Sequence, residues 1–210
     1  MTVELIDNFL QFLFTMAAGI WTGILFYRNG KQAYLLLTCF YATFSLGMFH
    51  WTLNILLFSY TPQVFYVSEL AWIASFMFLL TLGYTLSTPD ERKFQHPAVW
   101  LVPIICLPQM ILYIIHGDIL FNLIICGLTM VQGWYSVRGF FYAGMQSGRQ
   151  RNMQYFHTAV LCIILLEYCL WTLSCFWISE TLTNPYFWVD FLLTAALFAL
   201  LPAMRKAVEA

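Results

Sequence analysis

Three carboxylates stand inside long apolar stretches of the chain: Glu69, Glu167 and Asp190. A charged side chain in the hydrocarbon of a membrane costs at least about 2.5–3.5 kcal/mol, so an ionisable residue kept there indicates a function. With a rise of about 1.5 Å per residue, Glu69 and Asp190 lie roughly 7 Å, and Glu167 roughly 15 Å, from the nearer end of their expected helices. We therefore interpret these acids as candidate ligand-binding residues within a bilayer.

Helical spacing adds polar neighbours to this set. His50 and Asn54 are four positions apart, and Glu167, Trp171 and Ser174 follow i, i+4 and i+7, so each group shares one face of a helix. We expect Glu167 to be protonated or paired with His50. The alternative for His50 is an interior histidine whose hydrogen bonds are satisfied locally.

Tryptophans close to the acids supply aromatic walls that attract cations. The expected arrangement is an acidic, aromatic vestibule open to one side, which would favour a cationic or amine-bearing solute or use a proton. Its substrate-binding residues would be Glu69, Glu167, Asp190, His50, Asn54, Trp51, Trp171 and Ser174. We expect Glu180, in a connection, to lie apart from it. The alternative for Glu69 and Asp190 is contact with headgroup water.

The elements that must position these residues are seven apolar stretches of membrane-spanning length. The chain has 210 residues, of which 61% are hydrophobic and 9% charged, and this predicts an all-α polytopic membrane protein forming one transmembrane domain over 1–210. These stretches are separated by turn-forming residues such as Gly30, Gly148 and Asn184-Pro185. The expected spans are 5–27, 33–58, 64–86, 99–115, 119–143, 153–178 and 185–204.

The positive charges indicate an orientation. All nine Lys and Arg residues fall at alternate connections or at the C-terminus. The positive-inside rule therefore predicts a cytoplasmic C-terminus, an outside N-terminus, and outside connections at 59–63, 116–118 and 179–184. We expect the protein in the plasma (inner) membrane.

Several classes are excluded by what the chain lacks. The formal net charge of -1 gives no basic footprint for nucleic acid. The six cysteines all lie in apolar stretches without metal-binding spacing, so we expect neither a bound metal nor a cofactor.

Two parts of the chain share an ordered set of matches. Gly30-Lys31-Gln32 corresponds to Gly148-Arg149-Gln150, and Trp51-Thr52-Leu53 corresponds to Trp171-Thr172-Leu173. Further along, Pro62 followed by Glu69 corresponds to Pro185 followed by Asp190. These matches predict a parallel 3+1+3 repeat, with units over about 5–86 and 119–204 and a linker helix over 99–115.

This organisation resembles the SWEET sugar transporters and the wider PQ-loop group in its seven spans, outside N-terminus and two three-helix units around an inverting linker. The resemblance implies a pocket between the units, lined by the third and second helices of each. The corresponding residues here are Glu69 with Asp190, and Asn54 or Trp51 with Ser174 or Trp171. Acids replace the amides of a sugar carrier.

A small-solute membrane transporter is the first function that these features favour. The alternative is a seven-helix ligand sensor or membrane subunit that signals through a separate protein. An intramembrane metal-dependent hydrolase is the third hypothesis, and the chain is otherwise expected not to be an enzyme. The expected partners are the lipid bilayer, a small-molecule or cation ligand, and a second copy or another membrane protein.

Overall fold

The computed structural model describes residues 3–58 and 66–209, and every regular element in these ranges is a helix. Seven helices are long and apolar enough to cross a membrane, as predicted, which indicates an integral membrane protein. The elements are α1 (Val3–Asn29), α2 (Gln32–Phe58), α3 (Tyr66–Leu86), the short α4 (Pro89–Lys93), the 3₁₀ turn η1 (Pro97–Trp100), α5 (Leu101–His116), α6 (Ile119–Gly144), α7 (Arg149–Ser174) and α8 (Pro185–Glu209).

The turns use the residues that the sequence suggested. Gly30 and Gly148 adopt positive φ angles of 66° and 60°, a conformation that glycine adopts without strain. Asp118 accepts a hydrogen bond from the Phe121 backbone N–H at 2.9 Å and so caps α6. The sixth helix begins at Arg149 and ends at Ser174, about a turn earlier than predicted. The connection expected at 59–63 lies outside the described residues.

α1 illustrates why these helices suit lipid better than water. Its buried face carries Asp7, Gln11, Thr15 and Thr22, whereas apolar side chains such as Ile20, which is 59% exposed, face outward. A helix of a water-soluble protein shows the opposite distribution. Polar groups therefore gather inside the bundle, where they can contact one another or a ligand.

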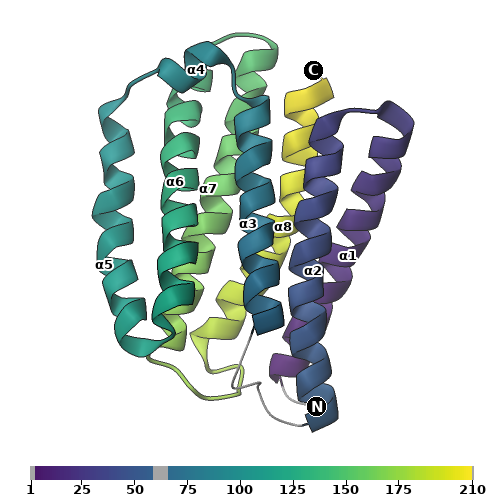
Figure 1. Cartoon of the computed structure of the whole chain (residues 1–210), viewed down its shortest axis with the longest axis vertical. Coiled ribbons are helices and arrows are strands. Elements are labelled where there is room, and N and C mark those ends of the chain that lie inside the picture. The colour runs from purple at the N-terminus through teal and green to yellow at the C-terminus, as the bar shows by residue number, and fades with distance from the viewer. Residues whose placement is uncertain (1–2, 59–65, 210) are drawn as a thin grey trace.

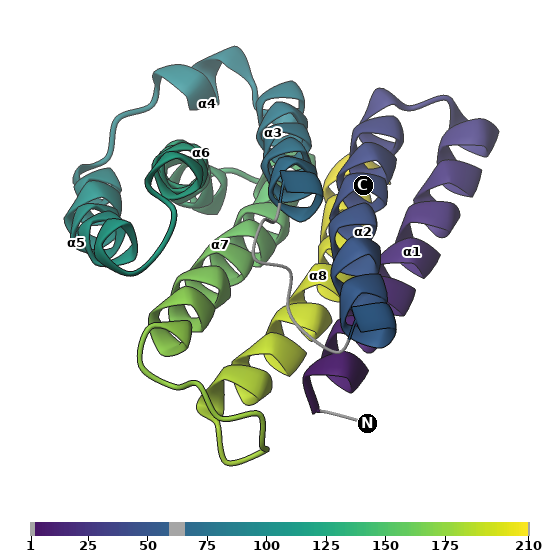
Figure 2. The same cartoon turned by 60° about the horizontal axis from the view of Figure 1, so that its bottom comes forward.

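Six of the long helices form a closed ring. α1 packs on α2, α2 on α3, α3 on α6, α6 on α7, α7 on α8, and α8 packs back on α1. α5 lies at one edge of the bundle against α6 and, less extensively, α7 (Figures 1 and 2). The interior of the ring is thus bounded by two groups of three consecutive helices, with α5 outside it.

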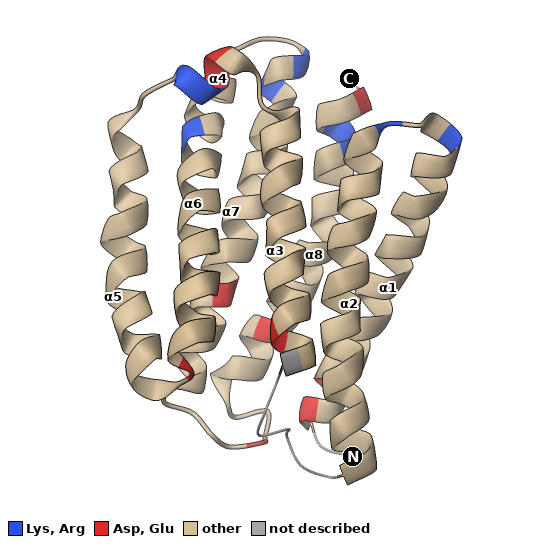
Figure 3. Cartoon of the chain, in the orientation of Figure 1, with Lys and Arg blue, Asp and Glu red and all other residues tan. Residues whose placement is uncertain are grey.

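The two ends of the bundle differ in charge (Figure 3). All nine Lys and Arg side chains lie toward the end that carries α4 and the C-terminus, which we call the basic end. Of the ten acidic residues, Asp90 and Glu91 lie there in α4, and Glu209 lies there at the end of α8. We call the opposite end, with Glu4, Asp7, Glu69, Asp118, Glu167, Glu180 and Asp190, the acidic end.

The basic half of the ring is tightly packed. Tyr34, Leu37, Phe40, Leu79 and Leu200 have no measurable exposure. Tyr41 donates a hydrogen bond across the interior to the Leu197 carbonyl at 2.6 Å, joining α2 to α8. Open space is therefore concentrated toward the acidic end.

Candidate functional site

A cavity of about 600 Å³ lies inside the acidic half of the ring. All six ring helices and the connection between α7 and α8 contribute side chains to it, whereas α5 contributes none of its described residues. This volume is within the range of about 300–1,000 Å³ that small-molecule sites occupy. Its walls combine carboxylates, amides and tryptophans: Glu4, Gln11, Glu167, Glu180, Asp190, Trp51, Trp72, Trp171 and Trp177.

Glu167 is the deepest acid along its helix. It is 6% exposed on α7 and lines the cavity. A largely buried carboxylate is costly without a partner of opposite charge, and none of the described residues that line the cavity is Lys, Arg or His. Glu167 is thus placed to bind a donor or a cation that enters the cavity.

Asp190 lines the same cavity from α8 and is held by α1. Gln11 donates from Nε2 to Asp190 Oδ1 at 2.7 Å and to Thr194 Oγ1 at 3.1 Å. Asp7 lies beside Asp190 with its side chain 1% exposed, and neither of its carboxyl oxygens receives a hydrogen bond from a described donor. The junction of α1 and α8 therefore carries two adjacent carboxyl groups and a single amide.

The predicted tryptophans form opposite parts of the wall. Trp51 on α2 donates from Nε1 to Glu4 Oε1 at 3.1 Å, and its ring centroid lies 5.9 Å from that of Trp72 on α3. Trp171 on α7 packs edge-on against Tyr113 at 5.6 Å. Ser174 is exposed at the rim of the same cavity. Aromatic faces and carboxylates thus surround one space.

Glu69 lies in an adjoining recess of about 250 Å³. This recess shares Trp51, Trp72 and Trp171 with the main cavity and contains Asp118 at the start of α6. Glu69 is half-buried and is not one of the residues that line the main cavity. Two of the three predicted acids therefore share the main cavity, and the third lies beside it.

His50 and Asn54 make local contacts instead of facing an acid. His50 Nδ1 is 2.9 Å from Ser68 Oγ, and Asn54 Nδ2 lies 3.2 Å from His50 Nε2 and donates to the His50 carbonyl at 2.9 Å. The expected pairing of His50 with Glu167 is wrong, because this face of α2 is turned toward α3. Neither residue lines either of the two cavities described above.

Three residues of α1 in or beside the cavity were not predicted from the sequence, and one residue of a connection was expected to lie elsewhere. Glu4 and Gln11 line the cavity and Asp7 lies directly behind them. Acids at the start of a helix are common because they favour the helix dipole, which concealed their role. Glu180, which was expected to lie apart, also lines the cavity because the 175–184 connection folds across its mouth.

The described part of the chain contains no evident metal-binding site. Among residues 3–58 and 66–209, no group of three or more His, Cys, Asp or Glu side chains is placed to hold a metal ion. The cavity acids are instead spread around a space large enough for an organic molecule.

Comparison with known proteins identifies no relative. No protein-family model, curated protein or solved structure matches this chain. The geometry of the cavity is therefore the basis for assigning a function.

Proposed function

We propose that this protein is a membrane transporter for a small cationic or amine-bearing solute, which binds in the cavity at the acidic end. The observation that carries the proposal is the charge of the cavity wall. Four carboxylates line it, from Glu4, Glu167, Glu180 and Asp190, and none of its described lining residues is Lys, Arg or His. At an effective dielectric constant of about 20, each carboxylate at 4 Å attracts a unit cation by about 4 kcal/mol before desolvation is subtracted.

Tryptophan faces suit the same ligand. A cation within about 6 Å of an indole centroid gains about 0.5–2 kcal/mol, and the gain increases as water is excluded. Trp51, Trp72, Trp171 and Trp177 contribute to the wall. Acids that provide charge and indoles that provide a face form a site that favours ammonium groups over neutral or anionic solutes.

The order of helix packing supports the proposed 3+1+3 repeat. In this repeat, α1, α2 and α3 correspond to α6, α7 and α8. The last helix of each unit should then pack on the first helix of the other unit. Both contacts are present in the ring, α3 on α6 and α8 on α1. Each of these junctions also carries two acids, Glu69 with Asp118 and Asp7 with Asp190. A site enclosed by two repeats is typical of secondary transporters.

We further propose that the acidic end faces outside and the basic end the cytoplasm, in the plasma (inner) membrane. Segregation of all nine Lys and Arg residues to one end supports this orientation. Trypsin should cleave after Arg149 or Arg151, in the exposed first turn of α7, in inside-out vesicles and spare this site in right-side-out vesicles. Cleavage in right-side-out vesicles would contradict the orientation.

A ligand sensor is the second candidate. The packed basic half, with Phe40, Leu79 and Leu200 fully buried, favours it because a receptor needs a pocket on one side only. Transport and sensing make opposite predictions for flux. Proteoliposomes loaded with unlabelled tetramethylammonium should accumulate the labelled cation by exchange if the protein is a carrier. Binding of this probe without exchange would overturn the transporter proposal and support the sensor.

A further inference from the structure

Asp7 is a buried acid of the acidic half that does not itself line the cavity. Its side chain is 1% exposed on the buried face of α1, one helical turn before Gln11, whose amide contacts the Asp190 carboxyl on α8. Both oxygens of Asp7 lack a hydrogen-bond donor among the described residues. Among residues 3–58 and 66–209, the one side-chain amide that donates to this junction is Gln11 Nε2, which donates to Asp190 Oδ1 at 2.7 Å and to Thr194 Oγ1 at 3.1 Å.

Every titratable group around this pair is acidic or a phenol. The titratable groups that line the cavity beside this pair are Tyr186 of α8, Glu167 of α7, Glu4 of α1 and Glu180 of the connection before α8. No Lys, Arg or His from the described part of these elements faces it. Two ionised carboxylates in contact, both buried and without a counter-ion, would repel strongly.

We propose that Asp7 and Asp190 hold one proton between them and release it when a cationic ligand reaches Asp190. One carboxyl donates its O–H to the other carboxylate, so the pair carries a single negative charge. A cation that approaches Asp190 from the cavity pairs with a carboxylate, and the proton leaves to water in the cavity. This inference rests on the proposed cation site and names its coupling ion: ligand and proton exchange for one another.

Infrared spectroscopy of the full chain in lipid vesicles at neutral pH tests the proton directly. The wild type should show protonated-carboxyl absorption that shifts in heavy water, and part of it should disappear in both Asp7→Asn and Asp190→Asn. Asp118→Asn is the matched control and should leave it unchanged. Identical absorption in the wild type and both variants would overturn the proposal, and so would its loss on adding sodium chloride, since the pair would then hold a metal ion.

The second arm tests the exchange on the unmodified protein and therefore does not depend on whether a variant folds. Saturating tetramethylammonium should remove the absorption assigned to the pair and acidify a weakly buffered medium by about one proton per protein. Saturable binding without proton release would overturn the exchange while leaving the cation site intact. Absence of binding, with the absorption of the pair present, would instead overturn the proposed ligand class.

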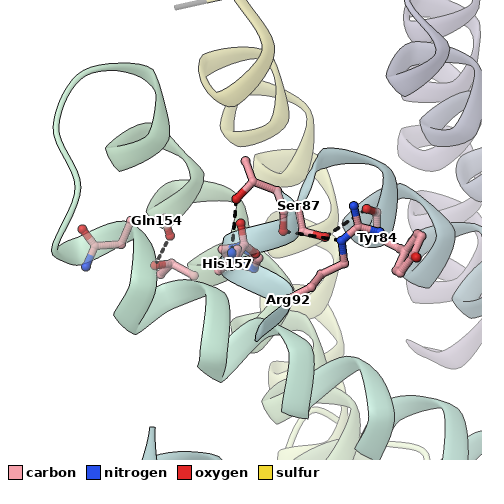
Figure 4. Close-up of polar contacts among 8 residues, drawn as sticks. Tyr84, Ser87, Arg92, Gln154 and His157 are labelled. Atoms are coloured by element: carbon pink, nitrogen blue, oxygen red, sulfur yellow. Dashed lines mark hydrogen bonds and ion pairs between the residues drawn. The ribbon is translucent and has the colours of Figure 1, made fainter. Parts of the chain in front are cut away.

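A different observation, at the basic end, carries a second inference. Glu91 of the short α4 is 4% exposed and reaches between α6 and α7, where its Oε1 lies 3.1 Å from Nε2 of His157, itself 2% exposed. Figure 4 shows His157 beside the segment that carries Ser87 and Arg92. A buried acid from a connecting segment thus contacts a buried histidine of the opposite three-helix group.

Neighbouring groups make room for this contact and hold α4 in place. A Cβ atom at position 139 of α6 would lie 2.2 Å from His157 Nε2 and 2.7 Å from Glu91 Oε1, so only glycine fits there. Thr88 caps α4 by accepting a hydrogen bond from the Glu91 N–H at 3.2 Å. The Arg92 guanidinium lies 4.3 Å from the centroid of the Tyr84 ring on α3.

A row of small or polar buried residues on α6 leads from the middle of the bundle to this contact. Thr129, Gln132, Ser136 and Gly139 lie on one face of the helix, and Gln132 Oε1 has no described hydrogen-bond donor. Such a row would be wetted if the basic end opened. The geometry points to α4 as a latch: the Glu91–His157 contact joins the two three-helix groups and closes the basic end.

Hydrogen–deuterium exchange of the full chain in lipid nanodiscs tests the latch without any ligand. Glu91→Gln and His157→Gln should each raise exchange in peptides covering 132–144 and 149–160 by several-fold, with no change around 3–15 or 185–195. The matched control is Asp90→Asn, which removes an exposed acid of the same short helix α4. Unchanged exchange in both latch variants, or an equal increase at both ends, would overturn the latch.

Discussion

The two ends of this bundle differ in how their acids are partnered. At the basic end, Glu91 is in contact with His157, and Glu209 binds Arg205 at 2.6 Å. At the acidic end, the carboxyl oxygens of Asp7 are buried without a hydrogen-bond donor among the described residues, and Glu167 lines a cavity with no Lys, Arg or His among its described lining residues. A fold that pairs its acids at one end retains unpaired acids at the other at a cost in stability. This difference indicates that the acidic end is shaped for a ligand and the basic end for closure.

The largest effect is expected from adding one carbon atom at the basic end. Gly139→Ala should lower the free energy of unfolding by about 1–3 kcal/mol, because its Cβ would overlap His157 and Glu91. Gly127→Ala on the same helix meets nothing within 4 Å and should be neutral or stabilising by up to about 1 kcal/mol. Denaturant unfolding in detergent measures both. Equal effects of the two substitutions would show that the basic end is not tightly closed.

Next in size is the loss of the deepest acid. Glu167→Gln should weaken tetramethylammonium binding by about 10- to 100-fold, because it removes a carboxylate that attracts a unit cation at 4 Å by about 4 kcal/mol before desolvation is subtracted. The variant should unfold no more easily than the wild type, because an amide is cheaper to bury than a carboxylate. Titration followed by tryptophan fluorescence measures the affinity, with exposed Asp90→Asn as the control. Unchanged affinity would remove Glu167 from the site.

A smaller effect is expected from the aromatic wall. Trp171→Leu should weaken tetramethylammonium binding by about three- to tenfold, and Trp171→Phe by less, as loss of a cation–π contact predicts. Because Trp171 also packs on Tyr113, circular dichroism must first show unchanged helix content. Calorimetric titration measures the affinity. If leucine and phenylalanine weaken binding equally, the indole acts through packing alone.

The smallest effect is expected from the adjoining recess. Glu69→Gln should change tetramethylammonium affinity by less than about threefold, because Glu69 lies outside the main cavity, where solvent screens its charge more strongly. Glu69 is half-buried and lines the recess, while Glu167 is buried in the main cavity. Comparison of Glu69→Gln with Glu167→Gln in one titration series ranks the two spaces. A larger loss for Glu69→Gln would place the ligand in the recess.

Hydropathy and turn residues were sufficient to predict the seven long helices. They were also sufficient to select Glu167 and Asp190, because an acid in an apolar helix is conspicuous wherever the helix packs. The position of His50 depended on how α2 is rotated in the ring, which its own sequence does not determine. That rotation turns His50 toward Ser68 and away from Glu167.

Other residues near the sites were not predicted, for two different reasons. Asp7, Gln11 and Thr15 repeat at helical spacing on the buried face of α1, and this pattern was a usable signal. Acids are common near the start of a helix, so Asp7 did not stand out there. Glu91 and Glu180 lie in connections, whose path back into the bundle is set by tertiary packing that no local pattern records.

Binding of three molecules of similar shape and different charge tests the central claim most directly. The purified wild-type protein in lipid nanodiscs would be titrated with tetramethylammonium, tert-butanol and pivalate, with tryptophan fluorescence as the readout. The acidic cavity predicts saturable binding of the cation, much weaker binding of the neutral alcohol, and none of the carboxylate. Equal binding of all three molecules, or preference for pivalate, would contradict a cation site at the acidic end.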